Sequence, residues 1–172
     1  ANTTVNVTAP MMVVARWNTE YRVDLSSDYA TATGGGWFTI GSSCNVSVQN
    51  VVDHGNGTRR VLEGWYRDGL LLSPASTLSM EVLEPISLEV KWETEYLVSA
   101  TTPVGHISGT AWYRRATNAT VSVSATRLED FFTNYVFEGW KIAEVSVSTS
   151  PSYSFTVTGP ISLAASWKTE LN

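Results

Sequence analysis

The chain has 172 residues, of which 43% are hydrophobic and 11% aromatic, enough for a packed core in one domain or two small ones. The 11 Lys and Arg residues stand against 16 Asp and Glu residues and leave a net charge of -5, so the chain lacks the basic face that nucleic-acid binding requires. No apolar run approaches the roughly 20 residues of a transmembrane helix, and the single cysteine excludes an internal disulfide framework.

The first predicted element is an N-terminal strand, residues 1–18. Its odd positions form one apolar face, made of Val5, Val7, Ala9, Met11, Val13, Ala15 and Trp17. Met12 and Val14 add apolar side chains on the opposite face, which is the pattern of a strand buried on both sides. The chain begins at Ala1 without methionine, as a secreted chain trimmed of its signal peptide would, although a trimmed recombinant chain would look the same.

The strand that ends in tryptophan recurs with a fixed period. Trp17, Trp92 and Trp167 are each 75 residues apart. Residues 22–97 align without a gap to residues 97–172. The alignment places Gly34 on Gly109, Trp37 on Trp112, Val46–Val48 on Val121–Val123, Glu63–Trp65 on Glu138–Trp140 and Pro85 on Pro160. A unit of this length is the size of a small domain, so we predict two tandem domains, residues 19–93 and 94–172.

Each unit is predicted to be β throughout. In the first unit the segments YRVDLSS, GWFTIG, NVSVQNVV, RRVLEGWY and LSMEVLEPISLEVKW are rich in β-branched and aromatic residues, and the second unit has matching segments. HGNG at 54–57 and RDG at 67–69 have the composition of hairpin turns. The fold class is therefore all-β: two tandem Ig-like β-sandwiches or small open barrels, plus an extra N-terminal strand.

The pattern of N-x-[ST] sequences indicates an extracellular location at the cell surface. Such acceptors occur at Asn2, Asn6, Asn45, Asn56 and Asn118. They matter only on surfaces that meet the glycosylation machinery, so N-linked glycans on some of these residues are expected.

The repeated unit resembles a known family of surface repeats. The carriers of the resemblance are Gly109, Trp112, Tyr113, Val121–Val123, Phe137, Gly139, Trp140, Pro160 and Trp167. In this order they are similar to the divergent internalin-type bacterial repeat, found in tandem in surface proteins of bacteria and thermophilic archaea. The resemblance implies surface localisation and adhesion or assembly. The first unit departs from it at Leu62, where the second has Phe137, and in its charged insert DHGNGTRR.

The Trp-ended strand occurs three times, but the rest of the repeated unit occurs only twice. Either neighbouring units share strands, or the N-terminal copy belongs to another molecule. A free strand is a liability unless it adds to a sheet, and a donor at one end with an acceptor elsewhere generates filaments. We therefore expect a head-to-tail homopolymer joined by the N-terminal strand, an arrangement that resembles the donor-strand pili and threads of archaeal surfaces. The alternative is a two-domain segment of an adhesin or surface-layer protein whose N-terminal strand folds back.

The sequence does not favour an enzyme. His54 and His106 lie in glycine-containing turns that do not correspond across the repeat. Glu63 and Glu138 do correspond, but one carboxylate per unit before Gly-Trp indicates a strand-edge or turn residue better than an acid–base pair. No zinc, phosphate or calcium motif is present, although aspartates near turns leave calcium as a minor alternative. Neither a catalytic site nor a cofactor other than glycan is predicted.

The tryptophans raise a carbohydrate-binding alternative, because exposed aromatic rings stack on sugars. The seven are Trp17, Trp37, Trp65, Trp92, Trp112, Trp140 and Trp167. All seven lie at positions that are equivalent between copies of the repeat, which favours packing in a core or at a domain junction over a ligand site.

Cys44 is expected to be a buried thiol.

Overall fold

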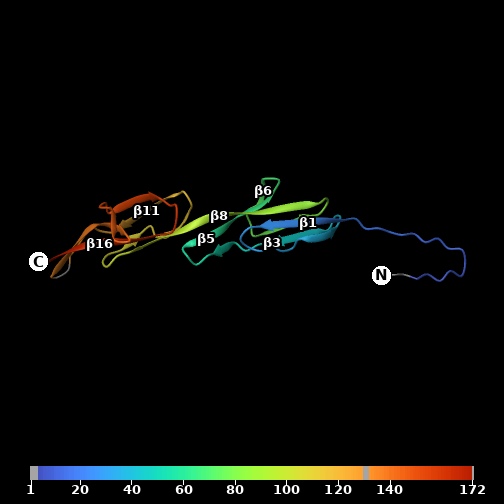
Figure 1. Cartoon of the computed structure of the whole chain (residues 1–172), viewed down its shortest axis with the longest axis horizontal. Helices are drawn as coiled ribbons and strands as arrows, with labels where there is room; N and C mark the ends of the chain where they lie inside the picture. Colours follow the sequence, from blue (N-terminus) through green and yellow to red (C-terminus); the bar gives the residue numbers. More distant parts are fainter. Residues whose placement is uncertain (1–3, 130–131, 172) are drawn as a thin grey trace.

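The computed structural model describes residues 4–129 and 132–171. These residues form an elongated rod with the early and the late strands at opposite ends, and residues 4–19 project from the end that carries β1 (Figure 1). Every regular element in these two ranges is a β-strand. The prediction of an all-β fold is confirmed.

The first half of the chain contains two hairpins that the sequence predicts. Its strands are β1 (Glu20–Ser27), β2 (Gly36–Thr39), β3 (Ser43–Ser47), β4 (Val51–Asp53), β5 (Thr58–Arg67), β6 (Leu70–Ser73), β7 (Thr77–Glu81) and β8 (Ile86–Thr101). Residues 54–57 connect β4 to β5, and residues 68–69 connect β5 to β6. Asp68 and Gly69 have φ angles of 50° and 81°, the left-handed conformation that tight hairpin turns require.

The second half repeats this order of strands. They are β9 (Ile107–Ser108), β10 (Ala111–Arg114), β11 (Asn118–Val123), β12 (Arg127–Glu129), β13 (Thr133–Ile142), β14 (Val145–Ser148), β15 (Ser152–Thr156) and β16 (Ile161–Leu171). Strand pairing also recurs at an offset of 75 residues. Val23 of β1 lies opposite Ile86 of β8 in a parallel pair, and Val98 of β8 lies opposite Ile161 of β16 in the same way.

Each half folds as two layers of sheet around its own hydrophobic core. One large sheet runs through both halves, and the smaller β3–β7 and β15–β11–β9 sheets provide the second layers. Val23, Val46, Trp65 and Leu88 belong to the first core, and a separate second core contains Trp140. We call the halves the first body (β1–β7 and residues 86–92 of β8) and the second body (the rest of β8 and β9–β16).

Strand β8 belongs to both bodies. Its early residues pair with β1 and β5, and its last residues pair with β16. At Glu95 and Tyr96, β5 of the first body pairs on one side and β10 of the second body pairs on the other. The predicted boundary between residues 93 and 94 thus falls inside a continuous strand, so main-chain hydrogen bonds cross the junction.

Glycine is required where a loop crosses the adjoining strand. A Cβ atom on Gly34 would lie 2.0 Å from the carbonyl oxygen of Asn45, and one on Gly109 would lie 1.9 Å from the carbonyl oxygen of Thr120. Both glycines also have positive φ angles, 95° and 90°. The Gly34–Gly109 match that the sequence shows therefore reflects a backbone contact found in both bodies.

The segment that the sequence predicts as a donor strand is unpaired in the single chain. Residues 4–19 lie outside every strand of the described chain, with a bend at Thr8 and Ala9, and the first strand begins at Glu20. A strand needs a hydrogen-bonded neighbour, and within residues 4–129 and 132–171 no strand runs beside the segment. We call residues 4–19 the N-terminal segment.

Candidate functional site

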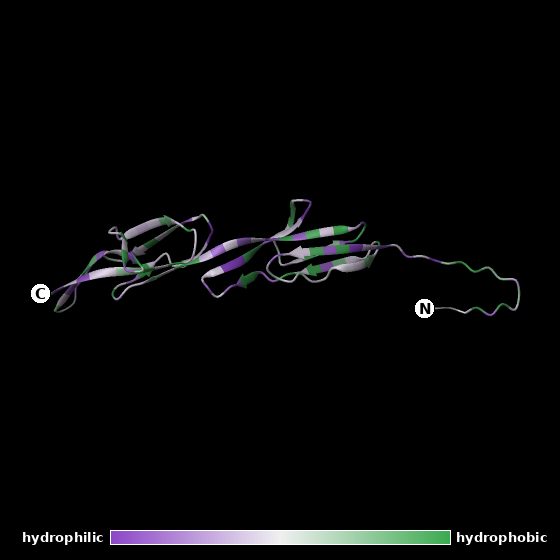
Figure 2. Ribbon diagram, in the orientation of Figure 1, coloured by the Kyte–Doolittle hydropathy of each residue, from purple (hydrophilic) through white to green (hydrophobic). Residues whose placement is uncertain are grey.

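The N-terminal segment exposes the apolar residues that the sequence assigned to a donor strand. Val5, Val7, Ala9, Met11, Met12, Val13, Val14, Ala15 and Trp17 are all exposed. Met12 is 87% exposed and Trp17 90% exposed, whereas Trp92 and Trp167, the counterparts of Trp17, are partly buried. Figure 2 shows the apolar stretches of this segment where it extends beyond the first body. Arg16 is its single charged residue, so charge does little to keep it in water.

The segment leaves the first body in line with β1. The amide of Ile40 donates a hydrogen bond of 3.0 Å to the carbonyl oxygen of Thr19. At the matching place in the second body, the amide of Arg115 donates to the carbonyl oxygen of Thr94, at 2.9 Å. Thr94 lies inside β8, and Thr19 is its counterpart. Residues 11–19 followed by β1 therefore correspond to β8, with the part before β1 left unpaired.

The counterparts of the segment show what its residues do when they are paired. In the repeat, Val13 corresponds to Leu88 and Leu163, which are almost completely buried in the two cores. Trp17 corresponds to Trp92 and Trp167. The indole N–H of Trp92 donates to the Ser27 hydroxyl at 3.1 Å, and that of Trp167 donates to the Thr102 hydroxyl at 2.9 Å. The exposed face of the segment therefore has the side chains of a core strand.

Both positions of this kind within the chain are occupied. Residues 86–92 fill the position in the first body, and β16 fills it in the second. The described chain therefore holds no empty position of this kind for the segment. The second apolar face of the segment also distinguishes it, because Met12 and Val14 stand where β8 has the exposed residues Ser87 and Glu89.

The seven tryptophans do not share one environment. Trp65 and Trp140 are fully buried, and Trp92 and Trp167 are partly buried. Trp112 lies at the junction of the bodies, with the guanidinium of Arg59 4.4 Å from the centre of its ring. Trp17 and Trp37 are exposed, at 90% and 65%. Packing in a core or at the junction thus describes five of them, and the two exceptions lie at the N-terminal end.

Four of the predicted glycosylation sites are exposed. Asn6 lies in the N-terminal segment, Asn45 in β3, Asn56 in the β4–β5 turn and Asn118 at the start of β11, and each is solvent-exposed. Asn2 lies outside the described residues. The exposed amides could carry glycan without rearrangement of either core.

The remaining polar candidates have local structural roles. The carboxylate of Glu63 accepts a hydrogen bond from the Tyr66 hydroxyl at 2.6 Å, and Glu138 accepts one from the Ser166 hydroxyl at 3.0 Å. Asp53 accepts the amide of Gly55 at 2.8 Å and closes the β4–β5 turn. Within residues 4–129 and 132–171, no three His, Cys, Asp or Glu side chains are arranged to hold a metal ion.

Cys44 is fully buried in β3, as the sequence predicts, and its thiol donates to the carbonyl oxygen of Gly34 at 3.3 Å. Burial raises the pKa of this thiol and so lowers its reactivity at neutral pH.

No helix of the described chain is long and apolar enough to cross a membrane.

Sequence reasoning does not identify the charged pairs at the junction of the bodies. Arg59 forms an ion pair of 2.7 Å with Glu95, and Arg114 forms one of 2.7 Å with Glu93. The signal that could have found them is the Thr-Glu dipeptide that recurs at residues 19–20, 94–95 and 169–170, because Glu95 belongs to it. The repeat alone indicates only a strand-edge or turn feature at these positions.

Comparisons with protein-family models, with curated proteins and with solved structures found no match for this chain.

Proposed function

We propose that this chain is a structural subunit of an extracellular filament, in which copies join head to tail at the cell surface and serve adhesion or cell–cell contact. The observation that carries the proposal is the state of the N-terminal segment. It is apolar on its core-type face and exposed along its whole described length, and its residues 11–19 correspond to the half of β8 that joins the first body to the second. A neighbouring copy supplies the sheet that it lacks.

Strand addition accounts for the energetics of such a joint. Residues 11–19 align with the first half of β8 and, at ~3.3 Å each, span about 30 Å when extended. Main-chain hydrogen bonds along this length provide affinity, and alternate side chains fix the register. The acceptor in this proposal is the sheet of another copy, either at a free edge or in place of β16. Because it is a different surface from the N-terminal segment, the contact does not close on itself and produces a filament.

A second candidate function is favoured by β8 itself. Because β8 joins two bodies within one polypeptide, the N-terminal segment could join a further body of a longer adhesin or surface-layer protein in the same way. In that case the rod is a spacer, and its exposed tryptophans are candidates for contact with carbohydrate. The two candidates differ in whether separate copies of this chain associate.

Deletion of residues 1–17 tests the filament proposal. The full chain is expected to form long thin fibres in electron micrographs, and the deleted chain is expected to sediment as a folded monomer, because both bodies keep their own Trp-ended strand. Thermal melts of the deleted chain should match those of the bodies in the full chain. A monomeric full chain would favour the spacer, and an unfolded deletion product would show that the segment completes the first body.

Glycosylation provides an independent test of the extracellular location. Native material is expected to carry glycan on at least two of the five acceptor asparagines, because four of them are exposed. Mass spectrometry before and after removal of N-glycans measures this. An intact native mass equal to that of the bare chain, 18.8 kDa, would contradict the location.

A further inference from the structure

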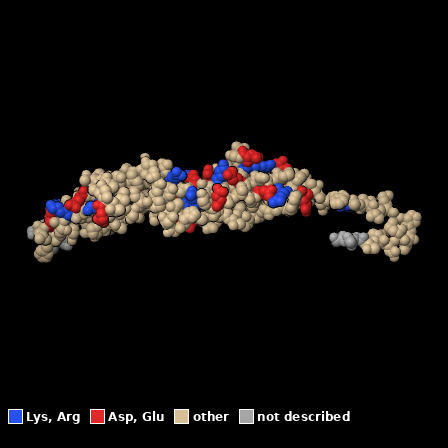
Figure 3. Space-filling model, in the orientation of Figure 1, with Lys and Arg blue, Asp and Glu red and all other residues tan. Residues whose placement is uncertain are grey.

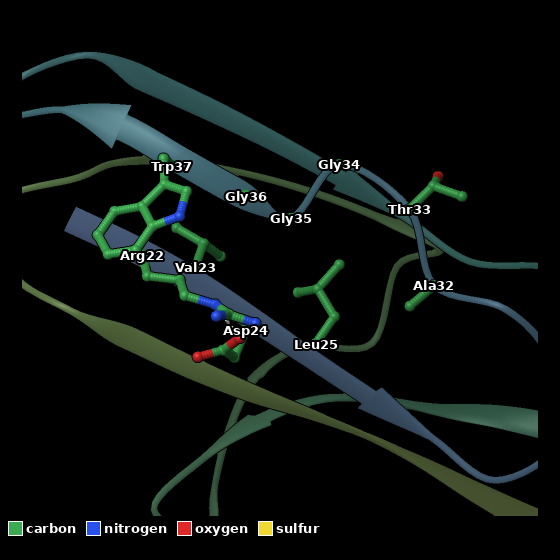
Figure 4. A pocket seen from close by; sticks show the side chains of 10 residues that line it. All are labelled: Arg22, Val23, Asp24, Leu25, Ala32, Thr33, Gly34, Gly35, Gly36 and Trp37. Atoms are coloured by element: carbon green, nitrogen blue, oxygen red, sulfur yellow. Dashed lines mark hydrogen bonds and ion pairs between the residues drawn. The ribbon is translucent and has the colours of Figure 1, made fainter. Parts of the chain in front are cut away.

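An open cleft lies in the first body where β1 and β2 separate. The pairing of the two strands ends with Val23 opposite Gly36, and β1 continues beyond it to Ser27. The cleft has a volume of about 630 Å³ and is lined by residues 22–25 of β1 and by residues 32–37, which lead into β2. Figure 4 shows these residues around it. The volume lies in the range of about 300–1,000 Å³ that is usual for ligand sites.

Three side chains with different chemistry share the solvent face of this cleft. Arg22 lies directly opposite Trp37 in the antiparallel pair, so both side chains point to the same face of the sheet. Asp24 lies two residues further along β1 and shares that face. Val23, between Arg22 and Asp24, is 2% exposed and points into the first core. We call Arg22, Asp24 and Trp37 the cleft cluster.

The indole ring of the cleft cluster is open to a ligand. Trp37 is 65% exposed, and within residues 4–129 and 132–171 no aromatic ring or cation stacks on it. Its counterpart Trp112 is instead covered by the guanidinium of Arg59, 4.4 Å from the ring centre. An exposed indole offers a flat, rigid apolar surface beside a polar surrounding. It can therefore stack against a ligand that has one apolar face.

The guanidinium and the carboxylate of the cleft cluster hold each other in place. Arg22 Nε donates to Asp24 Oδ1 at 2.7 Å, and Figure 4 shows the guanidinium turned toward Asp24 beside the Trp37 ring. The two side chains are 59% and 54% exposed. The other N–H groups of the arginine are donors, and the second carboxylate oxygen is an acceptor. Neighbouring hydroxyl groups, each of which donates and accepts, match such a pair.

The fold does not require this pair of charges. In the second body, which has the same order of strands, Leu97 stands in place of Arg22 and Ser99 in place of Asp24. An ion pair this exposed contributes about 1 kcal/mol or less to stability. A Cβ atom on Gly36 would meet nothing within 4 Å, so the backbone beside the cleft cluster also leaves space. These features favour a binding role over a structural one.

The charges around the cleft favour a neutral ligand. Arg22 and Asp24 are the two charged residues of its lining, and their charges cancel. On the face shown in Figure 3, basic and acidic groups lie side by side over the first body. Such a surface attracts neither a polyanion nor a strongly cationic partner. A pyranose ring fits this chemistry, because it is neutral, its C–H groups make an apolar face, and its hydroxyls surround that face.

We propose that the cleft cluster binds a neutral pyranose unit of a polysaccharide, whose C–H face stacks on Trp37 and whose adjacent hydroxyls bond to Arg22 and Asp24. This inference rests on the extracellular location proposed above, and it applies to the filament and to the spacer alike. It assigns an adhesive contact to the first body, separate from the N-terminal segment that joins one body to another.

The test measures binding of soluble oligosaccharides of glucose, mannose and galactose to the full chain by saturation-transfer NMR. The method observes the ligand, so it works for monomers and for fibres. The chain is produced without glycan, so that its own sugars do not compete. At least one of the three is expected to bind, with the strongest transfer to the C–H protons of one pyranose face. Trp37→Ala is expected to raise its Kd about tenfold or more, because the stacking surface is lost.

A second variant and a control keep the test specific. Arg22→Leu combined with Asp24→Ser introduces the residues that the second body has at these positions, so the chain should fold and bind the sugar about tenfold more weakly. Trp17→Ala removes the other exposed indole and should leave sugar binding unchanged. Thermal melts check that each variant is folded.

Failure of this site and failure of the filament give different results. Absence of binding by all three oligosaccharides, or binding that Trp37→Ala leaves unchanged, would overturn the site. Binding of tetramethylammonium in place of sugar, lost in Trp37→Ala, would assign the indole to a cation and would also overturn it. Fibres in electron micrographs without sugar binding would overturn the site alone, and a monomeric chain that binds sugar would overturn the filament alone.

Discussion

Val13→Asp is expected to abolish filament formation and to leave the melting temperature of the chain unchanged. Val13 is 72% exposed in the single chain, so a carboxylate there costs nothing in the monomer. Its counterparts Leu88 and Leu163 are almost completely buried, at 2% and 1% exposure. If the segment enters a sheet in the same register, the new carboxylate is buried without a partner, which costs several kcal/mol and lowers the association constant at least about 100-fold.

Two further substitutions show whether the effect comes from the face that the repeat predicts. Asn18→Asp places the same charge on the opposite face of the segment, where the counterparts Glu93 and Lys168 are charged, and should be tolerated. Met12→Asp tests the second apolar face and should impair assembly only if the inserted strand is covered on both sides. Light scattering and thermal melts on the three variants provide the comparison. Normal fibres from Val13→Asp would rule out insertion of the segment in this register.

The repeat accounts for most of what could be predicted about the fold. A β period of two residues identifies the core face of β8 and β16, and the 75-residue offset matches Gly34 to Gly109, which make the same backbone contact in the two bodies. These features are local or are related by the repeat, so the sequence contains them twice. Sharing of β8 between bodies is one of two explanations that the sequence allows for the third Trp-ended strand, and the structure contains such a shared strand.

The ends of the rod are harder to predict for a physical reason. A repeat shows which positions are equivalent, but it does not show which neighbour covers each copy. Trp112 and Trp37 are equivalent in sequence, yet the first is stacked on Arg59 and the second is exposed. The ion pair between Arg59 and Glu95 depends on the pairing of β5 with β8 across the boundary, and that pairing has no local signature. The repeat therefore does not predict which of its equivalent positions are exposed at the ends of the rod.

Trp140→Ala is expected to have the largest effect on stability. Trp140 is fully buried, and the Phe137 ring packs edge-on against it with ring centres 5.7 Å apart. Truncation of a buried tryptophan costs about 3–5 kcal/mol because it removes apolar contact and leaves a cavity. For a body of this size each kcal/mol lowers Tm by at least about 4 °C, so the second body should melt at least about 12 °C lower.

The control for this prediction, Trp140→Phe, keeps an aromatic ring but lacks the indole N–H group. Within the described residues the Trp140 indole N–H has no hydrogen-bond partner, so Trp140→Phe loses volume but relieves an unsatisfied donor and should cost less than Trp140→Ala. Trp37→Ala, at an exposed site, should change the free energy of unfolding by about 0.5 kcal/mol or less.

Because the two cores are separate and share only β8, calorimetry of Trp140→Ala should show two transitions, of which only the lower has moved. A single transition shifted as a whole would show that β8 couples the two bodies into one unfolding unit.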